Sequence, residues 1–261
     1  MCIRSWTGRV NGLKYQLLAL DMDGTLLNDN HEISPETAHW IGKAKDAGIH
    51  VCLSTGRPFS EAVPFGDQLG LSTPMVTVNG SEIWRSPHEL YHRELFDTAI
   101  IRKLYAIAEQ HDVWFWAYAV EGAYNKKSWD SSLLDTNQWI KFGYHTENAE
   151  IRHQILLQLQ EVQGLEITNS SLTNYEINPA GVNKATGIKV VCELLGLEMN
   201  QVIAVGDSLN DLAVIQAAGL GVAMGNAQIT VKENADYVTS SNNDDGIAEV
   251  IRKFIFSEEQ D

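Results

Sequence analysis

Short apolar runs alternate with segments of helical periodicity at both ends of the chain. The apolar runs predict strands over residues 15–20, 49–53, 75–78, 202–205, 220–223 and 236–238. The periodic segments predict helices over residues 35–47, 59–69, 184–195, 208–218 and 246–256. Ser34 and Pro35 form a typical helix start, with a capping hydroxyl before a proline at the first helical position. Such alternation over short connections is typical of a parallel sheet covered on both faces.

The stretch between the two halves differs in composition and pattern. It contains Trp114, Trp116, Trp129 and Trp139, and residues 114–118 have strong β propensity. Further strands are expected over 165–168 and 172–177, and helices over 97–110 and 148–160. We therefore predict an α/β protein in which residues 1–84 and 182–261 form one unit. Residues 85–181 form an inserted α+β unit, and residues 1–12 are a loose N-terminal extension.

The overall charge restricts the possible partners. The 261 residues carry a formal net charge of -15, so the surface repels nucleic acid and anionic lipid. The sequence has no apolar run long enough to span a membrane and no signal-peptide pattern. Cys2, Cys52 and Cys192 are too far apart for a zinc cluster or a disulfide framework, which favours a cytoplasmic protein. The oligomeric state cannot be predicted from these features.

Two acidic residues follow the first predicted strand directly. Asp21 and Asp23 belong to the segment DMDGT, and ligands bind at the carboxyl ends of the strands in a parallel sheet. Asp21 is the candidate nucleophile, and Asp23 is the candidate general acid and base. A polar turn would also explain a bare D-x-D pair, but the glycine and the preceding strand favour a site.

Polar residues also follow other predicted strands. Thr55 and Gly56 offer a hydroxyl and backbone N–H groups to phosphate oxygens, although turn residues alone could explain them. Lys184 opens a helix, where the helix dipole disfavours a cation unless it reaches an anion; a solvated lysine is the alternative. These residues predict a phosphate site at the sheet edge.

A second acidic group follows the strand at 202–205. Asp207 and Asp211 can join Asp21 and Asp23 around a metal ion, and oxygen ligands suit Mg²⁺. Asp211 could instead act through water or orient Lys184. Asn210 can donate a hydrogen bond. A helix-capping loop is the alternative explanation of this segment.

Taken together, four motifs resemble those of the haloacid dehalogenase superfamily. They are DMDGTLL, LSTGR, the Lys184 segment and GDSLNDLAVI; the segments VNGSEIW and EINPAGVNKATGI are similar to its Cof-type subfamily. The resemblance implies a Rossmann-like parallel-sheet core with an inserted α+β cap domain. It also implies that Asp21 is phosphorylated, and that Mg²⁺ is held by Asp21, by Asp207 and by either the backbone carbonyl or the carboxylate of Asp23. Phosphate would be bound by the Met22 backbone, Thr55, Gly56, Lys184 and Asn210.

The activity implied is hydrolysis of a small phosphorylated metabolite through an aspartyl-phosphate. Sugar phosphates and cofactor phosphates, including flavin and pyridoxal species, all fit. A phosphosugar mutase of the same superfamily is one alternative, and a phospho-accepting receiver protein is another. The cap should select the substrate. Candidate contacts are residues 114–118, His92, Tyr175 and Glu176, although we expect the aromatic residues mainly to fill the core of the cap.

Overall fold

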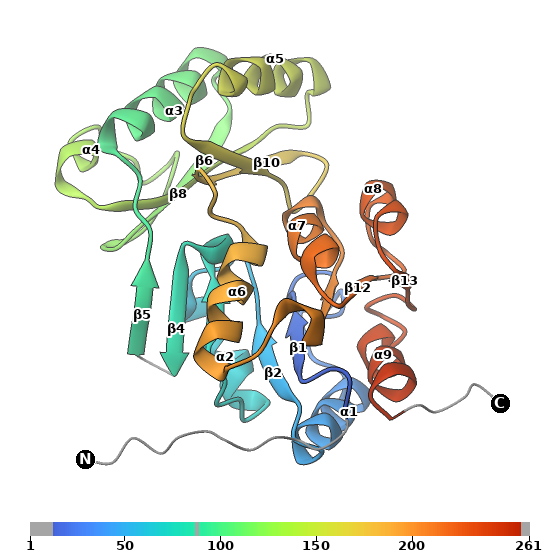
Figure 1. The fold of residues 1–261 in the computed structure, drawn as a ribbon. Helices are drawn as coiled ribbons and strands as arrows, with labels where there is room; N and C mark the ends of the chain where they lie inside the picture. Colours follow the sequence, from blue (N-terminus) through green and yellow to red (C-terminus); the bar gives the residue numbers. More distant parts are fainter. Residues whose placement is uncertain (1–12, 87–88, 257–261) are drawn as a thin grey trace, which may run out of the picture.

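A five-stranded parallel sheet forms the centre of the larger part of the molecule (Figure 1). The computed structural model describes residues 13–86 and 89–256. The strand order is β13-β12-β11-β1-β2. These strands are β13 (Tyr237–Val238), β12 (Leu220–Ala223), β11 (Val202–Gly206), β1 (Leu17–Leu20) and β2 (His50–Leu53). Because β1 pairs in parallel with both β11 and β2, residues far apart in sequence end at one edge of the sheet.

Helices cover both faces of this sheet. On one face, Leu18 and Leu20 of β1 pack with α1 (Pro35–Asp46), α2 (Phe59–Gln68) and α9 (Gly246–Phe254). On the other face, Leu17 and Ala19 pack with α6 (Lys184–Leu195) and α7 (Leu209–Ala217). Successive side chains point to opposite faces of a strand, and both faces are buried here, which explains the continuous apolar runs in the sequence. We call this part the core.

A second, antiparallel sheet lies above the carboxyl ends of the parallel strands (Figure 1). Its order is β7-β6-β8-β10-β9. The strands are β7 (Gly122–Asn125), β6 (Trp114–Ala119), β8 (Trp139–His145), β10 (Asn174–Pro179) and β9 (Leu165–Thr168). Helices α3 (Thr98–His111), α4 (Leu133–Thr136) and α5 (Ala149–Gln160) belong to the same cluster of apolar side chains. We call this part the cap, and its other face is turned toward the core.

A three-stranded sheet follows β2 in sequence and leads toward the cap. It is formed by β3 (Met75–Thr77), β4 (Glu82–Ser86) and β5 (Glu89–Arg93). A single bridge between Ser54 and Val76 joins β3 to the end of β2. The boundary expected between residues 84 and 85 therefore falls inside β4.

Most of the elements expected from the sequence are present, with small differences at their ends. Ser34 caps α1 by accepting a hydrogen bond from the backbone N–H of Thr37. The strand expected to end at Val78 stops at Thr77, because Val78 and Asn79 both have positive φ angles in the 3₁₀ turn η1 (Val78–Gly80). The strand expected over 172–177 begins at Asn174 and runs to Pro179. The remaining short helices are η2 (Met199–Gln201) and α8 (Ile229–Glu233).

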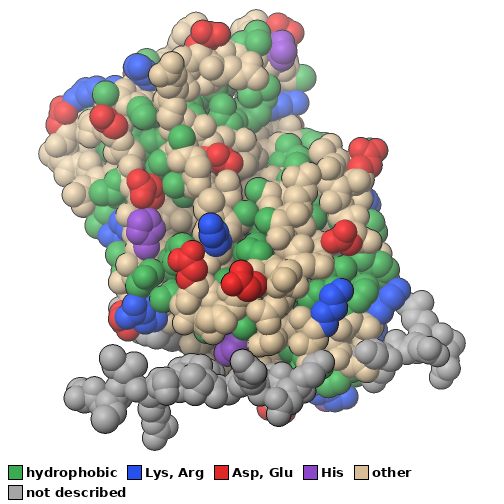
Figure 2. Space-filling model, viewed as in Figure 1, with side chains coloured by type: hydrophobic (Ala, Val, Ile, Leu, Met, Phe, Trp, Pro, Cys, Tyr) green, Lys and Arg blue, Asp and Glu red, His purple; other side chains and the backbone are tan. Residues whose placement is uncertain are grey.

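Other expectations concern cysteines, charge and membranes. Cys52 and Cys192 are buried free thiols, whereas Cys2 and the expected extension 1–12 lie outside the described residues. Acidic and basic side chains are interspersed over the face shown in Figure 2. Within the described part of the chain, none of the helices combines the length and apolar character needed to cross a bilayer.

Candidate active site

Three aspartates and one lysine meet where β1 and β11 end. Carboxylate oxygens of Asp21, Asp207 and Asp211 lie within 4.8 Å of one another. Lys184 Nζ donates to Asp21 Oδ1 and to Asp211 Oδ1, both at 2.6 Å. Asp21 and Asp207 directly follow adjacent parallel strands, whereas Lys184 and Asp211 lie in the first turns of α6 and α7. The topology therefore brings together residues from three distant segments.

Local backbone geometry allows these groups to approach closely. Gly24 has φ +77°, and a Cβ atom at this position would lie 2.6 Å from Asp207 Oδ2. Any side chain at residue 24 would both strain the turn and displace the Asp207 carboxylate. The glycine of DMDGT is therefore required by the second acidic motif as well as by its own turn.

Burial and neighbouring charges shift the pKa values of the residues in this cluster. Burial raises the pKa of Asp21 well above its ordinary value, and the neighbouring Asp211 raises it further, against the opposing effect of Lys184. Burial and Asp211 raise the pKa of Asp207 to about 7. Burial alone would lower the pKa of Lys184, but Asp21 and Asp211 outweigh it, so the pKa of this lysine is raised. Three carboxylates around one ammonium leave an excess of negative charge.

The donor set fits a hard divalent cation. Mg²⁺ prefers oxygen ligands from carboxylates and usually keeps several waters. Asp21, Asp207 and Asp211 supply such oxygens from one small region, and their mutual repulsion would be relieved by a cation. In addition, Asn210 Oδ1 is buried and has no hydrogen-bond partner among the described residues. The residues present therefore fit a bound metal ion.

The Asp23 side chain lies outside this acidic cluster. Its carboxylate accepts hydrogen bonds from Arg57 Nε at 2.8 Å and from Arg57 Nη2 at 2.5 Å, and its side chain is 47% exposed. Asp23 nevertheless lines the same cavity as Asp21. The structure thus places it within reach of a substrate and apart from the other three aspartates.

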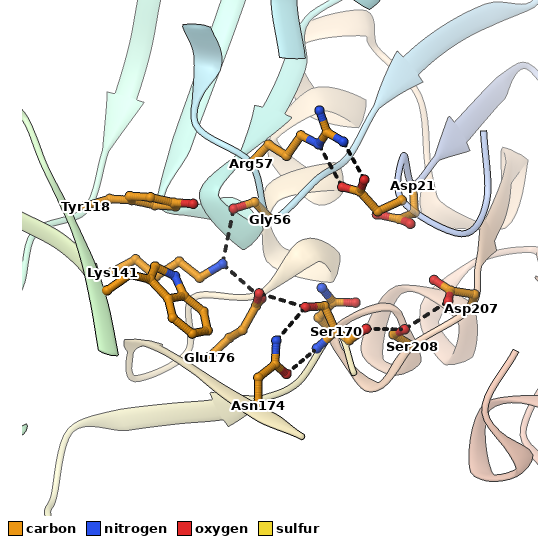
Figure 3. Close-up of a pocket in the computed structure, with 13 residues that line it drawn as sticks. Asp21, Gly56, Arg57, Tyr118, Lys141, Ser170, Asn174, Glu176, Asp207 and Ser208 are labelled. Carbon is orange, nitrogen blue, oxygen red and sulfur yellow. Dashed lines mark hydrogen bonds and ion pairs between the residues drawn. The ribbon is translucent and has the colours of Figure 1, made fainter. Parts of the chain in front are cut away.

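A cavity of about 260 Å³ lies between the core and the cap (Figure 3). From the core it is lined by Asp21, Asp23, Gly56, Arg57, Asp207, Ser208 and Asn210, and from the cap by Trp116, Tyr118, Lys141, Ser170, Asn174 and Glu176. The aspartates thus lie on the core side, facing a wall of aromatic and polar residues from the cap.

The residues predicted to bind phosphate surround the same strand ends. Thr55 follows β2, is 1% exposed, and accepts a hydrogen bond from the backbone N–H of Arg57. Met22 follows Asp21, and its side chain is buried in the core. Asn210 directs Nδ2 toward Asn79 Oδ1 at 3.4 Å. The amide group of Asn210 is therefore held by a neighbour that the sequence analysis did not select.

Only some of the cap residues expected to contact the substrate lie on a strand face that is turned toward the cavity. Phe115 packs into the core of the cap, as expected, but Trp116 and Tyr118 alternate with it and line the cavity. The expectation that the aromatic run mainly fills the cap core is thus wrong for these two residues. Glu176 lines the cavity, whereas Tyr175 packs against the cap core and His92 pairs with Glu94.

Sequence reasoning missed Arg57 and Lys141. Arg57 was part of the LSTGR segment but received no role. Lys141 is a single lysine in the apolar run WIKFGY, and a residue of this kind is usually assigned to the solvated face of a sheet. It is in fact 1% exposed and faces the cavity. A lone charge inside an otherwise apolar strand was the available signal.

Comparison with known proteins decides the family. Residues 18–251 match the family of haloacid dehalogenase-like hydrolases. The chain belongs to this family. The resemblance suggested by the four motifs is confirmed, and so is the prediction of a parallel-sheet core with an α+β cap.

Several proteins similar to this hydrolase are named as phosphatases. The 5-amino-6-(5-phospho-D-ribitylamino)uracil phosphatase YcsE of Bacillus subtilis is 45% identical over 240 residues, covering 92% of this chain and 96% of YcsE. A second phosphatase with the same substrate in its name, YitU of Bacillus subtilis, is 30% identical, covering 92% of this chain and 98% of YitU. A solved haloacid dehalogenase-like hydrolase from B. subtilis has 25% identity and a TM-score of 0.82, covering 91% of this chain and 99% of that one. The chain is thus a phosphatase of this family, and the receiver alternative finds no support.

Proposed function

We propose that the chain is a Mg²⁺-dependent phosphatase that forms an aspartyl-phosphate on Asp21. The observation that carries this proposal is the convergence of Asp21, Asp207, Asp211 and Lys184 at one edge of the parallel sheet, beside a cavity. Asp21, Asp207 and Asp211 would hold the metal. Asp23 would join them through its backbone carbonyl, because its carboxylate pairs with Arg57. When bound, Mg²⁺ supplies positive charge to the phosphate oxygens and to the carboxylates.

The protein side chains can carry out both halves of the reaction. An Asp21 oxygen attacks phosphorus, the bond to the leaving oxygen breaks, and Asp23 donates a proton to that oxygen. Water then attacks the phosphorus of the aspartyl-phosphate and gives a proton to Asp23. The bond between phosphorus and the Asp21 oxygen breaks, which releases inorganic phosphate and restores the Asp21 carboxylate. Both Asp23 oxygens accept hydrogen bonds from Arg57, so Arg57 must release at least one of them first. Lys184 stabilises the Asp21 carboxylate, and Thr55 and Gly56 would bind the phosphate together with the Met22 backbone and Asn210.

The size of the catalytic task explains why charge dominates the site. Enzymes that hydrolyse phosphate monoesters accelerate the reaction by up to ~10²¹-fold. Phosphoryl transfer depends mainly on positioning and on stabilising the charge of the transferred group. In a chain of net charge -15, the metal, Lys184 and Arg57 are local sources of positive charge for this purpose.

For the substrate, we propose a phosphate ester whose leaving group joins a polyol to a planar heterocycle. Support comes from YcsE and YitU, which are named for 5-amino-6-(5-phospho-D-ribitylamino)uracil. It also comes from the cap wall, where Trp116 and Tyr118 offer aromatic surfaces and Ser170 and Asn174 offer hydrogen bonds. Pyridoxal and sugar phosphates are then weaker substrates. A cytoplasmic location is proposed with this role, since the three cysteines fit a reducing compartment.

The test is phosphate release from a panel of phosphorylated metabolites, with Mg²⁺ and with EDTA. We expect Mg²⁺-dependent release, with the highest kcat/KM for the ribitylaminouracil phosphate. Product analysis in the same assay separates hydrolysis from the mutase alternative. An isomeric phosphosugar in place of free phosphate would favour the mutase, and equal release with EDTA would contradict the metal.

Metal binding can be measured without turnover. Mg²⁺ at a hundred times its Kd should stabilise the wild type by about 2.7 kcal/mol, because it binds the folded acidic cluster. Asp207→Asn should remove most of this gain, since it deletes one ligand charge. Thermal unfolding with and without Mg²⁺ measures both, and Asp135→Asn, on the exposed surface of the cap, is the matched control. A full Mg²⁺ shift in Asp207→Asn would exclude Asp207 as a ligand.

The proposed aromatic wall gives a prediction about specificity. Trp116→Ala should raise KM for the ribitylaminouracil phosphate about tenfold, within the 1–3 kcal/mol typical of base–aromatic stacking. The KM for ribose 5-phosphate, which lacks a heterocycle, should change little. Trp114→Ala is the matched control, because Trp114 lies two residues away on β6 but does not line the cavity. Equal changes in KM for both substrates would contradict ring stacking on Trp116.

A further inference from the structure

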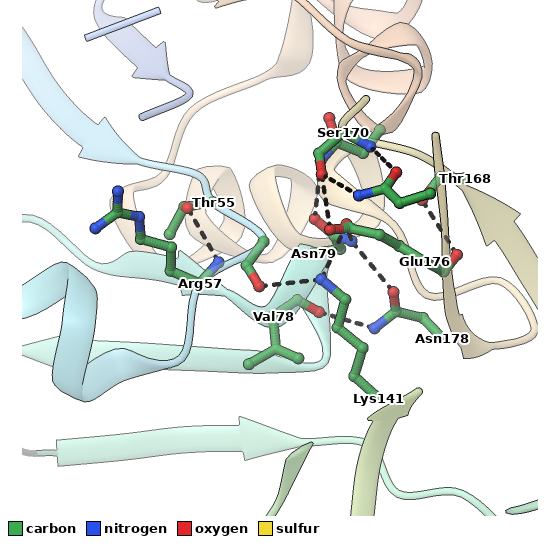
Figure 4. A network of polar contacts seen from close by, with 12 residues as sticks. Thr55, Arg57, Val78, Asn79, Lys141, Thr168, Ser170, Glu176 and Asn178 are labelled. Carbon is green, nitrogen blue, oxygen red and sulfur yellow. Dashed lines mark hydrogen bonds and ion pairs between the residues drawn. The ribbon is translucent and has the colours of Figure 1, made fainter. Parts of the chain in front are cut away.

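A buried ion pair of the cap contacts the phosphate-binding loop of the core. Lys141 on β8 and Glu176 on β10 are 1% and 6% exposed. Lys141 Nζ lies 2.9 Å from Glu176 Oε2 and also donates to the backbone carbonyl oxygen of Gly56 at 3.1 Å (Figure 4). An ammonium group of the cap thus holds the peptide group between Gly56 and Arg57.

The Glu176 carboxylate has little capacity left for a substrate. Its Oε2 accepts from Lys141 and from Asn79 Nδ2 at 2.7 Å, and its Oε1 accepts from Ser170 Oγ at 3.0 Å. Burial alone would raise the pKa of Glu176, but Lys141 and these hydrogen bonds outweigh it, so the pKa is lowered. The carboxylate is therefore a fixed anion, although it lines the cavity.

Asn79 links the ion pair of the cap to residues of the core through hydrogen bonds. Its Nδ2 donates to Glu176, its Oδ1 accepts from Asn210 Nδ2, and its backbone N–H donates to the Thr55 carbonyl oxygen at 2.9 Å. It follows Val78, which is a β-branched residue with a φ of 52° and so occupies a strained conformation. This turn is held from both sides. Asn178 Nδ2 of the cap donates to the Val78 carbonyl oxygen at 2.9 Å, and the Val78 N–H donates to the Arg57 carbonyl oxygen at 3.0 Å.

The packing around Gly56 leaves little room for a side chain at this residue. A Cβ atom on Gly56 would lie 2.9 Å from Asn79 Oδ1, 3.2 Å from Glu176 Oε2 and 3.2 Å from Lys141 Nζ. All three polar groups therefore lie close to the loop residue. Because Lys141 also bonds to the Gly56 carbonyl oxygen, we expect a change in the ion pair to affect the position of Gly56.

We propose that Lys141 and Glu176 are positioning residues that fix the Thr55–Arg57 loop for phosphate binding, and thereby make phosphate affinity depend on a seated cap. This inference rests on the proposed function, which assigns phosphate binding to Thr55 and Gly56. Lys141 and Glu176 act through Gly56 and Asn79 and do not contact the leaving group. Their loss should therefore affect all phosphate esters and free phosphate equally.

The experiment uses a paired substitution to separate positioning from stability. Removing one partner of a buried pair leaves an uncompensated charge, whereas replacing both with apolar residues is often neutral for stability. The variant is Lys141→Met/Glu176→Leu in the full chain. Its matched control is Arg93→Met/Glu82→Leu, which removes another ion pair with a buried carboxylate, joined at 2.7 Å and outside the catalytic cavity.

The readouts are the inhibition constant of inorganic phosphate, the KM for a ring-bearing and a ring-free substrate, and Tm. We expect the inhibition constant and both KM values to rise about tenfold. Changes of this size are typical when a residue that supports the direct ligands of an ion is replaced. The control variant should leave the inhibition constant, both KM values and Tm unchanged. A rise confined to the ring-bearing substrate would make Glu176 or Lys141 a substrate contact. A lower Tm with unchanged phosphate inhibition would make the pair purely structural, and either result overturns the proposal. Absence of Mg²⁺-dependent release by the wild type would instead refute the proposed function.

Discussion

We expect the Asp21→Asn variant to lose phosphatase activity by at least about 10⁴-fold while keeping its fold. The neutral amide cannot form the acyl-phosphate, and one of the three converging carboxylates is removed. Asn has nearly the same shape as Asp, so the buried site at the end of β1 should remain packed. Phosphate release under saturating Mg²⁺ and substrate measures the loss.

Stability provides the second half of this prediction. Burial and the charge of Asp211 raise the pKa of Asp21, so its ionised form is unfavourable in the metal-free site. Removing that charge relieves repulsion, and Asp21→Asn should have a Tm in EDTA at least as high as that of the wild type. Asp135→Asn serves again as the control for both measurements. Retained steady-state activity would contradict the nucleophile assignment, and a large loss of Tm would show that the activity loss reflects misfolding.

Replacing Lys184 with methionine should be the most destabilising of the changes considered. Lys184 is fully buried and lies 2.6 Å from oxygens of both Asp21 and Asp211. Its removal leaves two buried carboxylates without their cation, and breaking a buried pair in this way costs about 3–5 kcal/mol. Urea unfolding in EDTA measures the cost, and phosphate release should also be lost. Lys189→Met, at an exposed position of the same helix, is the matched control.

A double-mutant cycle tests the origin of this cost. If the loss comes from uncompensated charge, Asp211→Asn should restore part of the stability in the Lys184→Met background. Mg²⁺ should do the same, because it supplies positive charge to the same carboxylates. If Lys184→Met costs no more than Lys189→Met, the buried ion pairs do not stabilise the fold in the way described.

The sequence was informative wherever a local signal determined the local structure. Ser34 and Pro35 predicted the start of α1. Asn183 is the N-cap residue of α6, and Gly196 is its C-cap residue. The catalytic candidates were also predictable, because acidic residues after parallel strands meet at one sheet edge. This holds for Asp21 and Asp207, which come from paired strands that are more than 180 residues apart in the chain.

What could not be predicted depends on contacts between distant segments. The run containing β8 has a lysine and a glycine among apolar residues, so it matches neither a two-residue nor a helical period. Whether Lys141 faces solvent or the core depends on where the cap sits, and Gly56 lies 85 residues away. The pairing of Asp23 with Arg57 likewise joins two loops. The alternation of β6 decided which aromatic residues reach the cavity, and the register of that strand is set by β8.

The most direct test of the account is to trap the phosphoryl group on the protein. Asp23→Asn should react with acetyl phosphate, whose leaving group needs little protonation, but should lack the base that activates water for the second step. Acid quenching followed by peptide mass spectrometry should then find one phosphoryl group on Asp21, absent when Asp21→Asn is combined with Asp23→Asn. Phosphate release with no phosphoryl group on the protein, or a phosphoryl group on another residue, would contradict Asp21 as the nucleophile.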